Sequence, residues 1–291
     1  MSDMELFFKR AAALLDRLER FIPEPGRAPA FDSETSSCWR YSAETNRLET
    51  VRHPATIHLD DLKCIDRQKD LLVMNTRQFI HGLPANNALL WGPRGTGKSS
   101  LIKAILNEYS DQGLKIIEIA GKDLNRLPEI CDLLYEKNGR YIIFCDDLSF
   151  EADDPSYKAI KVILDGSTSQ APDNVLIYAT SNRRHLMPEY MSENLQSGYV
   201  DEELHMADSI EEKLALSERF GLWIAFHPLK QDDYLEIVNH WLSSLSGQDK
   251  HDWEEVRTAA LQWALLHGSR SGRSALLFSR DWAGKSGLKK L

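Results

Sequence analysis

Short apolar runs separated by polar or helix-forming segments dominate the pattern between residues 88 and 226. The runs are ALLW (88–91), KIIEI (115–119), YIIFC (141–145), VLIYA (175–179) and LWIAF (222–226). Continuous apolar strands that alternate with helices are typical of a parallel sheet covered by helices on both faces. The pattern therefore predicts an α/β fold built on a parallel five-stranded sheet.

The pattern takes a helical period at both ends of the chain. Apolar residues near the N-terminus recur at helical spacing from Phe7 to Ile22, and PEPGRAPA at 23–30 ends that segment. Residues 1–54 are therefore expected to form a helix and linker region, whose helix either packs on its own domain or docks a partner. After Pro228 three further helices are predicted, from DDYLEIVNHWL, DWEEVRTAALQWALLH and GRSALLFSRDWA.

The second of these C-terminal segments carries a helix start signal. Asp252 and Glu255 have the spacing of a capping box, in which the first side chain accepts from a backbone N–H of the first helical turn. We expect residues 229–291 to form a small helical domain after the α/β domain at residues 55–228.

A glycine-rich stretch follows the first apolar run directly. GPRGTGKSSLIKAIL fits the pattern GxxxxGK[ST] and lies between a predicted strand and a predicted helix. Glycines let backbone N–H groups turn around phosphate oxygens, and the helix N-terminus adds its positive end. Lys98 is expected to reach the β- and γ-phosphates, and the Ser99 hydroxyl to bind Mg²⁺. The predicted nucleotide-binding residues are Gly92, Pro93, Arg94, Gly95, Thr96, Gly97, Lys98, Ser99 and Ser100.

Two adjacent aspartates follow the third apolar run. Asp146 and Asp147 repel each other unless a cation lies near them, although such a pair by itself is also typical of a strand-to-loop turn. Downstream of a phosphate-binding loop, an acidic strand end holds Mg²⁺ and positions water in a P-loop NTPase. Asp146 is the expected magnesium-side carboxylate and Asp147 the expected base that orients water, with Glu151 as the alternative base.

Composition narrows the classes of partner and compartment. The formal charge of −9 argues against broad attraction to nucleic acid or to an anionic membrane, so any contact with nucleic acid is expected to be indirect. The four cysteines have no CxxC pairing, which favours neither a zinc site nor a disulfide framework. The N-terminus lacks a signal-peptide pattern and no apolar run is long enough to cross a bilayer. We expect a cytoplasmic protein without a membrane segment.

With these motifs in place, the chain resembles the AAA+ ATPase superfamily over roughly residues 55–291. The glycine-rich loop is similar to Walker A, and the acidic strand end is similar to Walker B. In VLIYATSNRR, Asn182 resembles the sensor 1 side chain that contacts the γ-phosphate or the attacking water. In LSERFGLWIAF, Arg219 resembles an arginine finger, which implies self-association.

The same resemblance implies two further parts of a nucleotide site. The C-terminal helices are similar to the AAA+ lid, and GSRSGRSALLF resembles its sensor 2 region, where Arg270 and Arg273 both fit. HLDDLKCIDRQKDLL resembles the segment that borders the adenine, with Leu62 and Ile65 as candidate base contacts. The chain departs from the family pattern in carrying Asp147 where many members have Glu, and in showing three predicted lid helices where four are usual.

Within the superfamily, GPRGTGKSS, DDLSFE, YATSNRRHL and RFGL resemble a bacterial group defined as a domain of unknown function. Helicase loaders of the DnaC and IstB type have a similar Asp-Asp Walker B. The resemblance implies an Mg²⁺-dependent ATPase that binds ATP and ADP and couples nucleotide state to a subunit or partner. The alternatives are a nucleotide-dependent switch or loader with incidental hydrolysis, and a P-loop small-molecule kinase. No motif identifies the partner.

Overall fold

The computed structural model describes residues 36–135, 137–148, 156–165, 172–182, 219–246 and 252–288. Within them a seven-stranded sheet has the order β2-β1-β4-β5-β6-β3-β7. Neighbouring strands are parallel throughout, except that β2 is antiparallel to β1. The strands are β1 (Cys38–Ser42), β2 (Arg47–Thr50), β3 (Ala88–Trp91), β4 (Leu114–Ile119), β5 (Arg140–Cys145), β6 (Val175–Ser181) and β7 (Leu222–Ala225).

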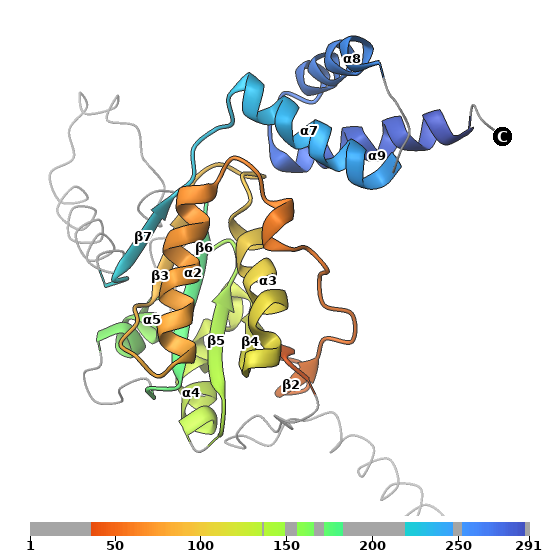
Figure 1. Cartoon of the computed structure of the whole chain (residues 1–291). Coiled ribbons are helices and arrows are strands. Elements are labelled where there is room, and N and C mark those ends of the chain that lie inside the picture. Colours follow the sequence, from red (N-terminus) through yellow and green to blue (C-terminus); the bar gives the residue numbers. More distant parts are fainter. Residues whose placement is uncertain are drawn as a thin grey trace, which may run out of the picture.

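Helices cover both faces of this sheet, as the alternating pattern predicts (Figure 1). On one face α2 and α3 contribute buried residues such as Leu72 and Leu101 to an apolar core. On the other face α4 and α5 contribute Ile130 and Ile160 to a second core. The helices are α2 (Asp66–Ile80), α3 (Lys98–Tyr109), α4 (Leu127–Tyr135) and α5 (Ser156–Asp165), with short 3₁₀ helices η1 (Leu59–Asp61), η2 (Ser110–Gln112) and η3 (Gly121–Arg126).

The prediction of a five-stranded sheet is wrong in strand number. The five apolar runs do form the parallel strands β3 to β7, but β1 and β2 extend the sheet beyond β4. β1 was missed because it is short and mixes polar with apolar residues: Trp39 and Tyr41 are buried, whereas Arg40 is exposed and donates to Glu118 of β4. Its parallel partner β4 lies 78 residues further along the chain, so no local signal indicates that pairing. These two strands fall within the predicted N-terminal linker region, and the domain division itself stays a prediction.

The described residues after β7 form three helices, at the three positions that the sequence predicts. They are α7 (Gln231–Ser246), α8 (Trp253–Leu266) and α9 (Gly272–Leu288). Tyr234, Val256, Ala260 and Phe278 belong to an apolar core of their own. The Asp252 carboxylate caps α8 by accepting from the backbone N–H of Glu254 at 3.0 Å, as its sequence position suggests. Figure 1 shows these helices above the carboxyl ends of the strands.

Two sequence-based expectations lie outside the described residues. They are the N-terminal helix at 7–22 and the alternative base Glu151. In the part of the chain that the structure describes, no helix is long and apolar enough to cross a bilayer.

Candidate functional site

The loop between β3 and α3 has a backbone that glycine makes possible. Gly92 has φ 141°, and a Cβ atom at this position would lie 2.1 Å from the carbonyl oxygen of Phe226. Any side chain would therefore push the loop away from the end of β7. Thr96 closes the same loop, because its hydroxyl donates to the carbonyl oxygen of Pro93 at 2.9 Å. The predicted phosphate loop is thus a tight turn anchored on the sheet.

Lys98 begins α3 and is buried under this loop. Its ammonium group donates to the carbonyl oxygens of Gly92 (2.6 Å) and Pro93 (2.8 Å) and to Oδ1 of Asn182 (3.1 Å). Burial lowers the pKa of Lys98 to about 8, against the opposing effect of the nearby Asp147 and Asp146 carboxylates. Because only neutral oxygens surround this buried cation, an anion bound beside it would be stabilised.

Asp146, at the end of β5, faces the start of α3. Its Oδ1 accepts from the hydroxyl of Ser99 at 2.5 Å and from the hydroxyl of Thr180 at 2.6 Å. The two groups predicted to lie on the magnesium side are therefore in direct contact. Thr180 takes part in this contact although sequence reasoning did not select it.

Asp147 turns the other way and has φ 54°, in the left-handed region. Its Oδ1 accepts from the side-chain amide of Asn182, and its Oδ2 pairs with Nη2 of Arg94 at 3.3 Å. The predicted water-orienting group, the predicted γ-phosphate sensor and a loop arginine thus meet at one point. Arg94 and Asp147 are both largely exposed, so solvent screens this ion pair.

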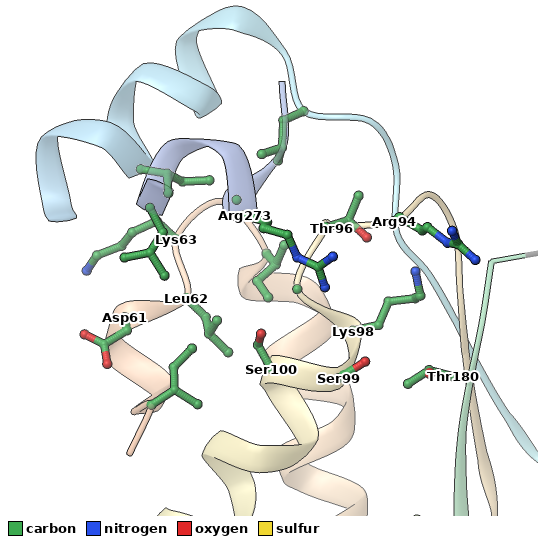
Figure 2. A pocket seen from close by; sticks show the side chains of 18 of the residues that line it. Asp61, Leu62, Lys63, Arg94, Thr96, Lys98, Ser99, Ser100, Thr180 and Arg273 are labelled. Carbon is green, nitrogen blue, oxygen red and sulfur yellow. The ribbon is translucent and has the colours of Figure 1, made fainter. Parts of the chain in front are cut away.

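The third helix of the C-terminal group contacts the loop from above. The backbone N–H of Gly272 donates to the carbonyl oxygen of Gly95 at 2.9 Å. Arg273, on the first turn of α9, lines the same cavity as Lys98, and Figure 2 shows it reaching toward the loop. Arg270 is exposed and is not among the residues that line this cavity. Of the two candidates for the lid arginine, the geometry favours Arg273.

The cavity between the carboxyl ends of the strands and the C-terminal helices has a volume of about 530 Å³. Part of its lining is apolar: Leu62 and Ile65, the predicted base contacts, are buried and line the cavity together with Ile237 and Trp241 of α7. Asp61 also lines the cavity, and its Oδ1 lies 3.2 Å from Nε2 of His240, which joins the segment before α2 to α7. The predicted loop residues that line the cavity are Arg94, Gly95, Thr96, Gly97, Lys98, Ser99 and Ser100.

Not every predicted residue reaches the cavity. Gly92 and Pro93 belong to the loop but do not line the cavity; their carbonyl oxygens accept from the Lys98 ammonium. Arg219 precedes β7, whose first residue pairs with Ala88, so it sits at the amino end of the sheet, opposite the loop. It is not among the residues that line the cavity of its own chain.

Sequence reasoning missed Thr180, Asp61 and Trp241. Thr180 is one of the two polar residues, with Ser181, that end β6 beside β5, and this position is a usable signal once the strand order is known. Trp241 lies on the apolar face of a predicted helix, and no motif in the sequence distinguished it from the other apolar residues there. Asp61, three residues before Cys64, lies in the segment that was predicted to border the adenine. It was not selected because other charged residues surround it in the sequence.

The side chains present fit a nucleotide and Mg²⁺. Serine hydroxyl and aspartate oxygens are ligands that Mg²⁺ prefers, and proteins commonly hold this ion through one or two carboxylates plus substrate phosphates. Among the described residues there is no cluster of three or more His, Cys, Asp or Glu side chains suited to a metal. The buried Lys98 ammonium supplies the positive charge that a phosphate group needs.

Comparison with known sequences finds AAA-ATPases. The AAA-ATPase At3g50940 of Arabidopsis thaliana is 30% identical over 225 residues, covering 69% of this chain and 46% of that protein. The replication factor C large subunit of Ignicoccus hospitalis is 35% identical over 74 residues, covering 25% of this chain and 15% of that protein. The chain thus spans less than half the length of these curated relatives.

Comparison with solved structures and family models places the fold. The crystal structure of the FIGL-1 AAA domain in complex with ADP matches with a TM-score of 0.51 and 17% identity, covering 79% of this chain and 74% of that one. This likeness shows that the chain has the AAA+ fold. The family model described as "Protein of unknown function (DUF815)" matches residues 34–286. The chain therefore belongs to the DUF815 family and has an AAA+ P-loop fold.

Proposed function

We propose that this protein is an Mg²⁺-dependent ATPase that couples its nucleotide state to its C-terminal helices and to a neighbouring subunit or partner. The observation that carries the proposal is the convergence of Lys98, Asp146, Asp147, Asn182 and Arg273 on one cavity, from four different parts of the chain. Sequence similarity to AAA-ATPases supports the same conclusion.

The chain's own groups have distinct roles in this proposal. Lys98 and the backbone N–H groups of the loop bind the phosphates, because a buried cation and a helix N-terminus both favour anions. Ser99 and Asp146 hold Mg²⁺, which when bound neutralises negative charge on the phosphate oxygens. Asp147 orients the attacking water, and Asn182, which donates to Asp147, holds that carboxylate in place.

The apolar part of the cavity takes the nucleobase in this proposal. Leu62 and Ile65 form one wall, and Trp241 of α7 supplies an aromatic surface from the opposite domain. Arg273 approaches the loop from α9. Both α7 and α9 contribute residues to the cavity wall. A nucleotide that fills the cavity is therefore proposed to change the position of the C-terminal helices, and with it the surface that they present to a partner.

Arg219 is proposed to act on a neighbouring subunit. Its place at the amino end of β7 keeps it from the phosphate loop of its own chain. An arginine supplied from a second molecule stabilises the charge that develops in phosphoryl transfer, and this requires at least transient self-association.

We further propose a cytoplasmic setting, because all four cysteines are free thiols, as expected in a reducing compartment.

A second candidate function, a nucleotide-dependent switch or loader, is favoured by one contact. Both carboxylate oxygens of Asp147 are engaged, by Asn182 and by Arg94. A base with both oxygens occupied activates water slowly, and slow hydrolysis suits a protein whose ATP-bound state is the working state. A helicase or another DNA-associated complex is the candidate partner of such a loader. The relationship to loaders of the DnaC and IstB type stays a prediction.

Steady-state hydrolysis at increasing protein concentration tests the ATPase proposal. We expect fewer than about one turnover per second for the dilute protein, rising as subunits assemble. Asp147→Asn is expected to retain ATP binding and to lower turnover at least about 100-fold. Arg219→Lys, which keeps the charge but loses the planar fork, is expected to abolish only the rise with concentration. Fast turnover that is independent of concentration would contradict the proposed assembly.

The same Asp147→Asn variant separates the two functions. If the variant no longer hydrolyses ATP but still performs its cellular role, the switch is the correct function. If the role is lost together with hydrolysis while ATP binding remains, the ATPase is correct. Because Asp147→Asn is expected to bind ATP without hydrolysing it, a pull-down with this variant also identifies the partner of the ATP-bound state.

A further inference from the structure

We propose that Thr180 is a positioning residue that sets the two carboxylates of the proposed ATPase site through one hydroxyl group. This inference rests on the proposed function, since it assigns Asp146 to Mg²⁺ and Asp147 to the attacking water. Thr180 acts through its hydrogen bonds to these two aspartates.

The strand register brings Thr180 to this place. The last pair between β5 and β6 is Cys145 with Ala179, so Thr180 stands beside Asp146 one step further along. Thr180 is 1% exposed. A polar side chain this deeply buried needs hydrogen-bond partners, and here its partners are the aspartates of the adjacent strand.

Thr180 contacts three successive residues of the strand end. Its hydroxyl donates to Oδ1 of Asp146 at 2.6 Å and accepts from the backbone N–H of Asp147 at 2.9 Å. Its carbonyl oxygen accepts from the backbone N–H of Leu148 at 2.6 Å. A hydroxyl has one proton, so donation to the carboxylate leaves its lone pairs for the amide, and both bonds form together.

These bonds explain why the two carboxylates point in different directions. The turn after β5 requires Asp147 to adopt φ 54°, which residues other than glycine rarely do. The bond from its N–H to Thr180 holds this conformation, and the Asp147 side chain is thereby directed to Asn182. Asp146 is fixed in the opposite sense, between Ser99 and Thr180.

The hydroxyl also gives Asp146 a permanent donor. Ser99 is the second donor to the same carboxylate oxygen, and in the proposed site the Ser99 oxygen is needed for Mg²⁺. Thr180 keeps its hydrogen bond whichever way Ser99 turns. Partners that orient a metal-binding carboxylate in this way typically change metal affinity or activity about 10- to 100-fold when removed.

Three variants test the proposal. Thr180→Val removes the hydroxyl at nearly constant shape, and Thr180→Ser keeps it. Thr76→Val is the matched control, because Thr76 is also fully buried and its hydroxyl also bonds, to the Leu72 carbonyl oxygen and to Tyr178, but outside the cavity. ATP affinity is measured by calorimetry with Mg²⁺ and with EDTA, and turnover is measured at saturating ATP.

The expected loss is specific to magnesium. Thr180→Val should bind ATP in EDTA within about twofold of wild type, but should lose about 10- to 100-fold of the affinity gained with Mg²⁺ and a similar factor in turnover. Thr180→Ser should stay near wild type in both. Thr76→Val should show an unchanged magnesium effect, even if its unfolding temperature falls.

A Thr180→Val variant with the wild-type magnesium effect and turnover would overturn the proposal. If Thr180→Val does not fold, Thr180→Cys keeps the volume with a much weaker donor, and the same magnesium-specific loss is expected; a wild-type response of that variant would overturn the proposal equally. Failure of the proposed function is visible separately, because wild-type protein would then bind no ATP under either condition.

Discussion

Lys98 is 6% exposed, and three neutral oxygens surround its ammonium group. Burial lowers its pKa to about 8, so the side chain is still mostly protonated near pH 7 and lacks a directly bonded carboxylate. The two nearby aspartates are instead bonded to Ser99, Thr180, Asn182 and Arg94. The site therefore keeps the Lys98 ammonium apart from both carboxylates, so that this cation is available to an anionic ligand.

Burial has the opposite effect on the cysteines. It raises the pKa of Cys131 and of Cys145 from 9.0 to about 12. In the unfolded chain these thiols ionise above pH 9, whereas in the folded chain they stay protonated. Their contribution to stability is therefore complete below pH 9 and is lost as the pH rises toward 12, by up to about 1.4 kcal/mol per thiol and pH unit.

We predict that the free energy of unfolding falls between pH 8.5 and about 10.5, measured with urea. In Cys145→Ala the fall should be smaller, because one buried thiol no longer titrates. Each protein is compared with itself at the two pH values, so the cost of the substitution cancels. Equal slopes for wild type and Cys145→Ala would mean that Cys145 ionises as easily in the folded chain as in the unfolded one.

At the scale of elements, the loop after β3 and the first turn of α9 are built to touch. Gly95 has φ 77°, and a Cβ atom there would lie 2.8 Å from Oγ of Ser271 and 2.9 Å from its Cβ. Ser271 in turn accepts from the backbone N–H of Ser274 and so supports the start of α9. A side chain at position 95 would displace the helix turn that carries Arg273.

We therefore predict that Gly95→Ala lowers ATP affinity by about tenfold, which is about 1.4 kcal/mol, as measured by calorimetry with Mg²⁺. The matched control is Gly113→Ala. Gly113 has φ 86° but no atom within 4 Å of the added Cβ, so it shares the backbone strain without the contact. Both variants should lose about 1–2 kcal/mol of stability from the left-handed backbone, and ATP affinity should fall only in Gly95→Ala. Equal affinities would show that the contact with α9 does not influence binding.

The elements that sequence reasoning predicted are those with a continuous local signal. The apolar runs from Ala88 to Phe226 became β3 to β7, and the helical periods after Pro228 became α7 to α9. β1 and β2 were not predicted, because both are short and partly polar, and β1 joins the main sheet through β4, far along the chain. A sheet edge of this kind is defined by its partner, which local pattern does not reveal.

The site divides in the same way. Lys98 and Ser99 were predicted because the loop motif carries its own geometry, and Asp146 because it ends an apolar strand downstream of a phosphate-binding loop. Spacing left Arg270 and Arg273 equivalent, and only the contact between α9 and the loop favours Arg273. No local sequence motif indicated Thr180, because only the register of β5 against β6 places it beside Asp146.

At the scale of the whole molecule, the cavity lies where three bodies of structure meet: the carboxyl edge of the sheet, the segment before α2, and the C-terminal helices (Figures 1 and 2). Hydrogen bonds link the C-terminal helices to each of the other two parts, from Gly272 to Gly95 and from His240 to Asp61. A ligand that fills the cavity contacts all three, so its binding is linked to their relative placement.

Calorimetry of ATP with Mg²⁺, using wild type, Lys98→Ala and Lys122→Ala, tests the central claim most directly. Lys122 is an exposed lysine of η3 and serves as the control. We predict one ATP per wild-type chain, an affinity lower by about 10- to 100-fold or more in Lys98→Ala, and an unchanged affinity in Lys122→Ala. Absence of ATP binding by folded wild-type protein, or equal affinity in Lys98→Ala, would contradict the account.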